Sequence, residues 1–415
     1  MAAPKLRFKE FDQKWGVDAL QDQIDFLAGY AFDSKLMSNE PQKYQLIKMS
    51  NVYQNQLDLT RNPSYWTKID SKIEKFLLKK GDIVLTLTGT VGKTDYGYNV
   101  EIDKDDKFLL NQRLVRLRAK QDLSDSKFIQ YRISTDKFFY HFFYSSKGGT
   151  GNQSNVSIED LKLLELSFPS KEEQTKIASF LSAVDEKISQ LTQKHELLSQ
   201  YKQGMMQKLF SQQIRFKADD GSEFGEWVQS KITDVADYVD YRGKTPKKVE
   251  DGILLVTAKN IRFGYIDYSV SQEYICSDDF DEVMRRGRAE IGDVLITTEA
   301  PLGNVASVDR ENIALAQRVI KYRGKKGILN NEFLKQKFLS EEFQSLISSK
   351  ATGGTVQGIK GSTLHNLEIH IPEDIEEQTK IANFLSSIDQ KVDVVAQQIE
   401  QAKQWKKGLL QQMFV

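Results

Sequence analysis

Glu172-Glu-Gln-Thr-Lys-Ile-Ala178 occurs a second time, without change, at Glu376–Ala382. Seven identical residues in the same order arise very rarely by chance, so the match indicates an internal duplication. The agreement continues past the block, because Phe180-Leu-Ser182 corresponds to Phe384-Leu-Ser386. The two copies begin 204 residues apart in a chain of 415, and this separation predicts two related halves.

Shorter matches upstream keep the same order, with small insertions between them. The chain is therefore written A–B–A′–B′, where A is a variable globular segment and B is a well-matched tail that begins at the repeated block. The length alone predicts two to three domains at ~150 residues each. The matched positions are Trp15 and Trp227, Asn51 and Asn260, Gly81–Leu85 and Gly292–Ile296, Gln112-Arg113 and Gln317-Arg318, Gly148–Thr150 and Gly353–Thr355, and Pro169 and Pro372.

Segment B has the pattern of a long helix. Its first turn carries two glutamates, which the helix macrodipole favours there, and apolar residues then recur at alternating steps of four and three. This period of 3.5 residues is typical of helices that wrap around each other. The positions are Ile177, Leu181, Val184, Ile188, Leu191, His195, Leu198, Lys202, Met205 and Leu209 in the first copy, and Ile381, Leu385, Ile388, Val392, Val395, Ile399, Ala402, Lys406, Leu409 and Met413 in the second.

We expect the two helices to pack on each other in antiparallel orientation as a rigid spacer. At ~1.5 Å per residue, about 38 residues would span ~57 Å. The alternative is that each helix packs only on its own globular segment. Lys202 and Lys406 interrupt both seams at matched positions, and we interpret them as places where a helix end meets solvent.

Segment A is predicted to be a mixed α+β globule. Alternating apolar residues predict strands at 83–87 and 114–118 in the first copy, and at 294–297 and 319–322 in the second. Further strands at 164–168 and 367–371 precede the two helices. Helical spacing covers 128–143 and 332–348. The pattern lacks the long alternation of strands and helices that a Rossmann sheet requires.

Composition restricts the class of protein. Lysine and arginine number 58, as do aspartate and glutamate, so the net charge of zero excludes a polybasic protein but not local basic patches that bind DNA. The single Cys276 excludes a multi-cysteine metal site and suits a reducing cytosol. We expect no metal site at His365 and His370 either. Because no signal segment or run of ~18 apolar residues is present, we expect a cytoplasmic protein.

Three motifs resemble catalytic sites but lack essential parts. Thr88–Thr94 has only two residues between its glycines, where a phosphate loop has four before the lysine. Asn62-Pro-Ser-Tyr65 lacks the second proline and the glycine-rich loop of amino-methyltransferases. The acidic run 101–107 has no counterpart in the second half. We therefore predict no catalytic residues in this chain.

The sequence does predict contact with nucleic acid, and it does so once in each half of the chain. Polar, glycine-rich loops at 145–155 and 348–360 offer amides and hydroxyls that suit phosphates and base edges. A solvated surface loop is the alternative for each segment alone. The residues that we expect to contact DNA are Thr88, Gly89, Thr90, Gly92, Lys93, Thr94, Gln112, Arg113, Lys147, Thr150, Asn152 and Gln153, and in the second half Arg242, Lys244, Thr245, Lys247, Lys259, Asn260, Asn304, Gln317, Arg318, Lys350, Thr352, Thr355 and Gln357.

The layout resembles the specificity subunit (HsdS) of type I restriction–modification systems over essentially the whole chain. The features that carry this resemblance are the repeated block that opens each long helix and the Gly-Asp-(Ile/Val) strand with its glycine-containing turn. The resemblance implies a target recognition domain at 1–170, a conserved spacer helix at 171–213, a second target recognition domain at 214–373 and a second spacer helix at 374–415. Each recognition domain would read one half of a split, asymmetric DNA site.

The resemblance also implies the partners. The spacer helices would fix the distance between half-sites and dock two modification subunits, which bind S-adenosylmethionine and methylate adenine. Restriction subunits would supply ATP- and Mg-dependent translocation and cleavage. The chain itself would bind double-stranded DNA without catalysis and without cofactor. The loop at Tyr241–Lys248 has no basic equivalent in the first half, so the resemblance does not predict its symmetric use.

The alternative function is a coiled-coil adaptor with two protein-binding heads. A DNA-binding assay at several salt concentrations distinguishes the two hypotheses. The affinity of a DNA-reading protein falls steeply as salt rises, whereas an adaptor would not bind DNA.

Overall fold

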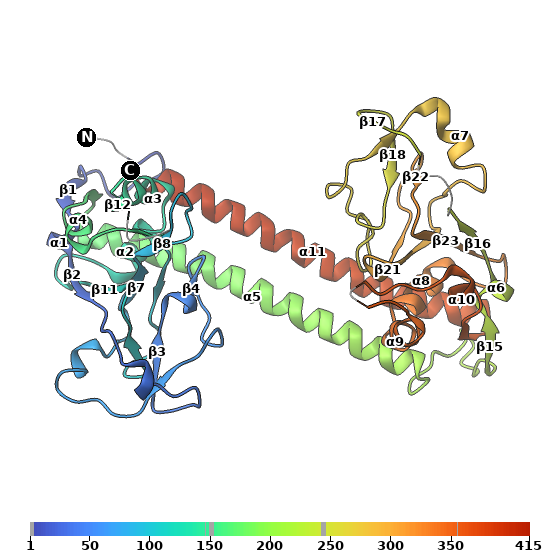
Figure 1. Cartoon of the computed structure of the whole chain (residues 1–415), viewed down its shortest axis with the longest axis horizontal. Coiled ribbons are helices and arrows are strands. Elements are labelled where there is room, and N and C mark those ends of the chain that lie inside the picture. Colours follow the sequence, from blue (N-terminus) through green and yellow to red (C-terminus); the bar gives the residue numbers. More distant parts are fainter. Residues whose placement is uncertain (1–3, 146, 149–152, 242–245, 355) are drawn as a thin grey trace. The chain divides into compact units, whose positions relative to one another are not determined.

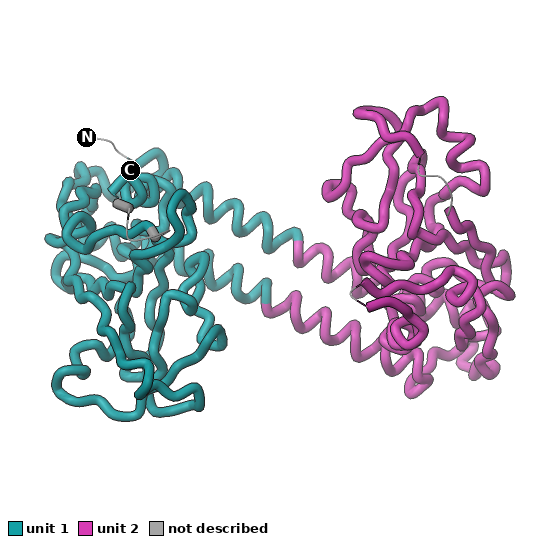
Figure 2. The backbone as a smooth tube through the Cα atoms, in the orientation of Figure 1, with its two compact units in different colours: residues 1–192, 397–415 teal, residues 193–396 magenta. Residues whose placement is uncertain are grey.

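The structure is a computed structural model that describes residues 4–145, 147–148, 153–241, 246–354 and 356–415. The chain forms two compact units (Figure 2): unit 1 contains residues 1–192 and 397–415, and unit 2 contains residues 193–396. Two long helices, α5 (Lys171–Phe210) and α11 (Ile375–Met413), are each shared between the units. Each unit therefore holds the first half of one long helix and the second half of the other.

Each unit is built on a four-stranded antiparallel sheet (Figure 1). In unit 1 the order is β2 (Ile24–Ala28), β11 (Leu114–Ala119), β7 (Ile83–Thr86) and β9 (Asn99–Glu101). In unit 2 the order is β16 (Ala236–Asp240), β23 (Val319–Gly324), β20 (Val294–Thr298) and β21 (Leu302–Ser307). The strands of the two sheets correspond one to one, so the duplication predicted from the sequence is also a duplication of topology.

A second sheet in each unit contains one parallel pair. Unit 1 has β10 (Phe108–Leu110), β3 (Tyr44–Ile47) and β6 (Tyr65–Trp66), with β10 parallel to β3. Unit 2 has β17 (Lys248–Val249), β19 (Tyr274–Ile275), β18 (Ile253–Val256) and β22 (Ala314–Leu315), with β18 parallel to β22. Both faces of the main sheet are buried, because Ile83 and Leu85 contribute to one core of unit 1 while Val84 contributes to the other.

Shorter elements complete the units. The remaining strands are β1 (Gly16–Ala19) paired with β14 (Glu165–Phe168), β15 (Trp227–Lys231) paired with β24 (Glu368–Pro372), the hairpin β4 (Val52–Tyr53) and β5 (Gln56–Leu57), and a sheet of β12 (Lys147–Gly148), β13 (Gln153–Asn155) and β8 (Thr88–Thr90). The remaining α-helices are α1 (Leu20–Gln23), α2 (Ser126–Arg132), α3 (Asp136–Tyr144), α4 (Ile158–Lys162), α6 (Ile232–Val235), α7 (Phe280–Val283), α8 (Asn331–Leu339), α9 (Glu341–Lys350) and α10 (Gly361–His365), and 3-10 turns lie at 34–36, 49–51, 74–76 and 277–279.

The α+β class is confirmed, and the six predicted strands are present within a residue or two of their expected bounds. The helical stretches 128–143 and 332–348 are not single helices, however. Each is divided by a hydroxyl residue in extended conformation, whose side chain caps the following helix. Thr135 accepts a hydrogen bond from the Phe138 amide, and Ser340 accepts one from the Phe343 amide. Apolar spacing continues across both breaks, so periodicity alone did not reveal them.

The repeated block joins each long helix to its globular part. Its second glutamate is buried and accepts two hydrogen bonds from an arginine: Glu173 from Arg7, and Glu377 from Arg215. The next residue is a glutamine that bridges loops on both sides of the helix start. The Gln378 side chain bonds the Asn330 amide and the carbonyls of Ile328 and Pro372, and Gln174 does the same in unit 1. These bonds give the second glutamate and the glutamine of the block the same structural role in both units.

The helix seams pack together within each unit, so the alternative of separate helices is wrong. In unit 1, Ile177, Leu181 and Val184 of α5 share a core with Leu409 and Met413 of α11. In unit 2, the end of α5 shares a core with the start of α11 in the same way. The predicted seam is buried or half-buried throughout, but near the end of α5 the buried methionine is Met206 rather than Met205. A helix of 3.6 residues per turn drifts against a strict period of 3.5.

Our interpretation of Lys202 and Lys406 was wrong. Lys202 forms an ion pair with Asp389 of the opposite helix, with 2.6 Å between Nζ and Oδ1, and its side chain is only 17% exposed. Lys406 makes the equivalent pair with Asp185 in unit 1, also at 2.6 Å. The sequence pattern marks polar seam positions but does not show that an acid next to the seam of the other helix pairs with them. In the part of the chain that the structure describes, no helix combines the length and apolar character needed to cross a membrane.

Unit 2 should lose stability in acid through Asp293. This buried carboxylate accepts hydrogen bonds from Nε and Nη2 of Arg323 at 2.6 and 2.7 Å, and Lys321 Nζ lies at 3.2 Å. Burial by itself raises the pKa of Asp293, but Arg323, the Glu290 amide and Lys321 outweigh it and hold the pKa below its ordinary value. Stability from a lowered pKa is present above the unfolded value of about 3.9 and is lost as the pH falls through the folded value.

Asp293→Asn should therefore lower the midpoint of urea unfolding at pH 7, and the gap to wild type should shrink below pH ~4. Asp278→Asn, at an exposed position of the 3-10 turn at 277–279, is the control and should change little. A gap between wild type and Asp293→Asn that stays constant down to pH 3 would contradict this account.

Candidate nucleic-acid interface

Three of the predicted DNA-binding segments meet at the end of the central strand in each unit. In unit 1 the Leu87 amide donates to the Arg113 carbonyl at 3.3 Å, and the Val156 amide donates to the Leu87 carbonyl at 3.0 Å. These two bonds join the turn after β7, the Gln112-Arg113 turn and the end of the first polar loop. We call this arrangement the loop junction.

The same bonds form the loop junction of unit 2. The Thr298 amide donates to the Arg318 carbonyl at 2.9 Å, and the Ile359 amide donates to the Thr298 carbonyl at 2.9 Å. These segments are far apart in the sequence. The structure brings them together in both units through the same two backbone hydrogen bonds. The segments that border the two junctions differ in length and in side chains, so one frame presents two different surfaces.

An arginine in the left-handed region stands at each junction. The φ angle is 68° at Arg113 and 71° at Arg318, and both side chains are exposed. A non-glycine residue with positive φ costs about 1–3 kcal/mol and persists where surrounding structure enforces it, often at functional sites. Arg318 Nε also lies 2.5 Å from Glu299 Oε1, so an ion pair directs this guanidinium. Glu299 itself forms a backbone bridge with Gly358 of the polar loop.

The turn at 88–94 exposes only its outer part. The Asp95 carboxylate accepts hydrogen bonds from the hydroxyl and the amide of Thr90, at 2.7 and 2.8 Å, and these bonds lower the pKa of Asp95. The turn therefore closes on an acid, and Gly92, Lys93 and Thr94 are exposed beyond it. Thr88 lies beneath, where its buried hydroxyl donates to Asn155 Oδ1 at 3.0 Å. Gly89 packs against the ring of Tyr96. Thr88 and Gly89 therefore support the turn, while Lys93 and Thr94 are available to a ligand.

In the sequence, Gly303-Asn304 follows the strand β20 as the turn at 88–94 follows β7, so the two segments look equivalent, but the structure shows that they are not. Gly303 corresponds to Gly97, because both have a φ of 80° and both approach the helix that ends each recognition segment, α9 or α3. Nine residues separate Leu87 from Gly97, but only four separate Thr298 from Gly303. The first turn is longer, and its extra glycine produced the apparent match. The Asn304 side chain is half-buried and donates to the Ile261 carbonyl at 2.8 Å. It therefore links β21 to the segment around Ile261 rather than facing the junction.

Asn260, which we expected to contact DNA, is not available to a ligand. Its side chain is fully buried: Oδ1 accepts from the Thr257 amide, and Nδ2 donates to the carbonyls of Asp267 and Ser271. Asn51 makes the equivalent bonds to Lys48, Asp58 and Arg61 in unit 1. All polar atoms of both amides are used inside the protein. The neighbouring Lys259 is exposed and stays a prediction.

The remaining candidates lie on exposed loops or outside the described residues. Lys350 ends α9, Thr352 and Gln357 flank a short backbone-paired turn, and all three are exposed. Gln112 and Lys247 are exposed, and Gln317 is half-buried. Thr150, Asn152, Arg242, Lys244, Thr245 and Thr355 lie outside the described residues, as do the side chains of Lys147 and Gln153. Sequence reasoning missed Asp95 and Glu299, which shape the two junctions, because neither has a counterpart in the other half.

Gly303→Ala should destabilise unit 2 by about 1–3 kcal/mol, because alanine is strained at positive φ. A Cβ there would also come within 2.7 Å of atoms of Gln344 and Ile347. Gly354→Ala is the matched control, since no atom lies within 4 Å of the Cβ position. Thermal unfolding of the two variants tests this, and equal melting temperatures would contradict the packing role of Gly303.

These features define a duplicated α+β protein in which each unit carries a loop junction with an exposed arginine. The Type I restriction modification DNA specificity domain matches residues 12–200 and 225–404, and the chain belongs to this family. It is 26% identical over 360 residues to the type I restriction enzyme MjaVIII specificity subunit of Methanocaldococcus jannaschii, covering 84% of this chain and 81% of that protein. It is 22% identical over 404 residues to the EcoBI specificity subunit of Escherichia coli, covering 90% and 79%.

A solved structure has the same fold. The crystal structure of the S subunit of a type I restriction–modification system from M. genitalium superposes with a TM-score of 0.62 at 18% identity, over 100% of this chain and 99% of that one. The family and this neighbour confirm the resemblance drawn from the repeated block.

Proposed function

We propose that this chain reads a two-part DNA site for a type I restriction–modification complex, with one loop junction for each half of the site. The observation that carries the proposal is the duplicated junction, in which one backbone frame holds two different sets of exposed side chains. Reading of base edges requires exposed donors and acceptors on a fixed frame. Because the two sets differ, the two half-sites should differ in sequence.

We also propose how the chain works with its partner subunits. The chain acts without catalytic residues or cofactor in the cytoplasm, and the long helices fix the half-site distance and dock two modification subunits. S-adenosylmethionine binds to those partners, and restriction subunits use ATP and Mg. Membership of the specificity family supports this division of labour.

Co-expression with the modification subunit of the same system, followed by mapping of methylated bases on a plasmid, tests the proposal. We expect methylation at a split motif with an unspecific gap of fixed length. A continuous motif would contradict two separate readers. The adaptor would be favoured instead if the complex does not methylate DNA, the chain shows no salt-sensitive DNA binding, and the chain forms a stable complex with other proteins.

A further inference from the structure

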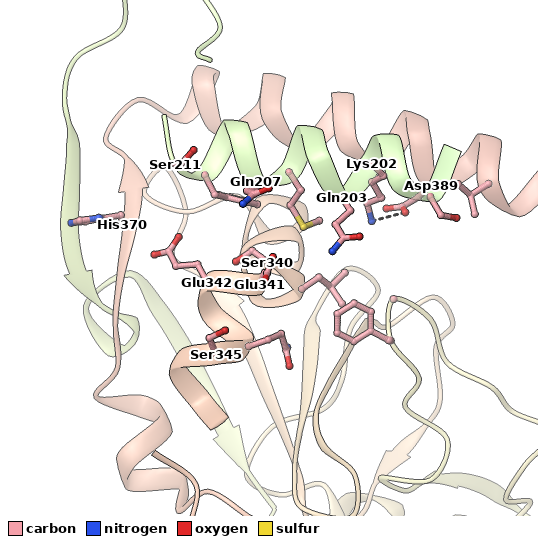
Figure 3. A pocket seen from close by; sticks show the side chains of 18 of the residues that line it. Lys202, Gln203, Gln207, Ser211, Ser340, Glu341, Glu342, Ser345, His370 and Asp389 are labelled. Carbon is pink, nitrogen blue, oxygen red and sulfur yellow. Dashed lines mark ion pairs between the residues drawn. The ribbon is translucent and has the colours of Figure 1, made fainter. Parts of the chain in front are cut away.

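A groove of about 970 Å³ lies beside the long helices in unit 2. Figure 3 shows one wall formed by Lys202, Gln203 and Gln207 of α5, with the ion pair between Lys202 and Asp389 at one end. The start of α9, with Glu341 and Glu342, forms the facing wall. Met206, Phe210 and Leu339 provide an apolar floor.

Unit 1 has an equivalent groove of about 800 Å³, lined in large part by residues at the same repeat positions. The pairs that keep their chemistry are Lys406 and Lys202, Asp185 and Asp389, Gln411 and Gln207, Phe414 and Phe210, Leu410 and Met206, and Ile188 and Val392. An ion pair at one end and an apolar floor are therefore common to both grooves. Among the described residues, none that forms a loop junction lines either groove.

The rims differ in charge. Where unit 2 has Ser199, Gln203 and Glu342, unit 1 has Lys403, Lys407 and Lys137. Five lysines and two aspartates line the unit 1 groove, whereas one lysine and three acids line the unit 2 groove. Lys137 and Lys407 are exposed, and no acid pairs with either of them among the described residues. Lys403 pairs with Glu400 at 3.1 Å, and Asp136 also lines the groove. The unit 1 rim therefore keeps a net positive charge, which Lys137 and Lys407 carry.

An amphipathic helix fits a groove of this kind, because helical walls and an apolar floor accept one face of a helix while the rim selects charge. Two equivalent seats also suit two copies of one partner. A DNA backbone is a poorer match, since the floor offers Leu410, Phe414 and Ile188 to it.

We propose that each groove seats the same acidic amphipathic helix from one of two copies of the modification subunit, and that the unit 1 groove binds it more tightly. This inference rests on the proposed function. The lysine rim attracts the acidic segment in unit 1, and unit 2 lacks these lysines. Glu342 already pairs with Lys337 at 2.7 Å, and Glu341 has an acidic equivalent in Asp136, so the difference between the grooves comes from the lysines. The two copies should therefore bind in two unequal steps, and salt should weaken the tighter step more.

Titration of the full chain with its modification subunit, followed by native mass spectrometry at low and high salt, tests the inference. The variant Lys137→Glu/Lys403→Ser/Lys407→Gln gives unit 1 the rim of unit 2. We expect it to weaken the first step at least tenfold and to make the two steps alike. The reciprocal Ser199→Lys/Gln203→Lys should strengthen the second step, and it leaves Glu342 in its ion pair with the buried Lys337.

A matched control makes the same charge change at exposed positions of the long helices that line neither groove, Lys187→Ser/Lys194→Gln/Lys391→Glu. If the control weakens the first step equally, or if rim exchange changes neither step, the inference is overturned while the proposed function stands. If the rim variant instead weakens DNA binding by the chain alone, the groove is a phosphate contact and the inference is also wrong. If wild type does not bind the modification subunit at all, the proposed function fails with it.

Discussion

Glu377→Ala is expected to destabilise unit 2 by ~3–5 kcal/mol, because removing one partner of a buried ion pair leaves the other charge uncompensated. The Glu377 side chain is fully buried and accepts bonds from Nε and Nη2 of Arg215 at 3.0 and 2.8 Å. Arg215 is itself only 20% exposed, so water replaces the lost carboxylate poorly. Hydrogen exchange read peptide by peptide would locate the loss of protection in unit 2.

Glu376→Ala is the matched control for this prediction. Glu376 is the preceding residue of the same repeated block, but its carboxylate is exposed and pairs with Lys380 at 3.1 Å. Exposed pairs contribute at most ~1 kcal/mol. Glu173→Ala and Glu172→Ala form the equivalent set in unit 1 and should affect that unit alone. Equal losses from the buried and the exposed glutamate would show that the Arg215 pair is not the source of the stability.

The sequence predicted the features that repeat. The identical block, the 3.5-residue seams and the paired strands each occur twice, and the second occurrence separates a real pattern from a chance one. Arg7 and Arg215 were missed although they too are matched. Each lies more than 160 residues from the glutamate that it bonds, within a match of only a few residues. A buried pair between distant segments leaves no local pattern.

The sequence also identified the segments of the candidate site better than the roles of their residues. It selected the turn, the Gln-Arg pair and the polar loop separately as DNA contacts, and the loop junction joins all three. It could not distinguish Asn260, whose amide is fully buried, from polar residues that face solvent. Polarity predicts hydrogen bonding but not whether the partner is the protein or a ligand, so burial had to come from the structure.

Arg318→Gly is expected to weaken binding of the DNA site by about 10- to 100-fold, which corresponds to ~1–3 kcal/mol for loss of one arginine contact. Glycine is the suitable replacement because it adopts the φ of 71° without strain, whereas alanine would also destabilise the junction. The unfolding midpoint should therefore stay close to wild type while affinity falls.

The duplication supplies the internal comparison for this variant. Arg113→Gly should produce the same loss at the other half of the site, so methylation mapping of the complex should show relaxed sequence preference in one half for each variant. Arg285→Ala, at an exposed arginine outside the junction, should leave affinity unchanged. If Arg318→Gly and Arg113→Gly relax the sequence preference of the same half-site, the two junctions do not read separate half-sites. If both bind DNA as tightly as wild type, the left-handed arginines serve the fold alone.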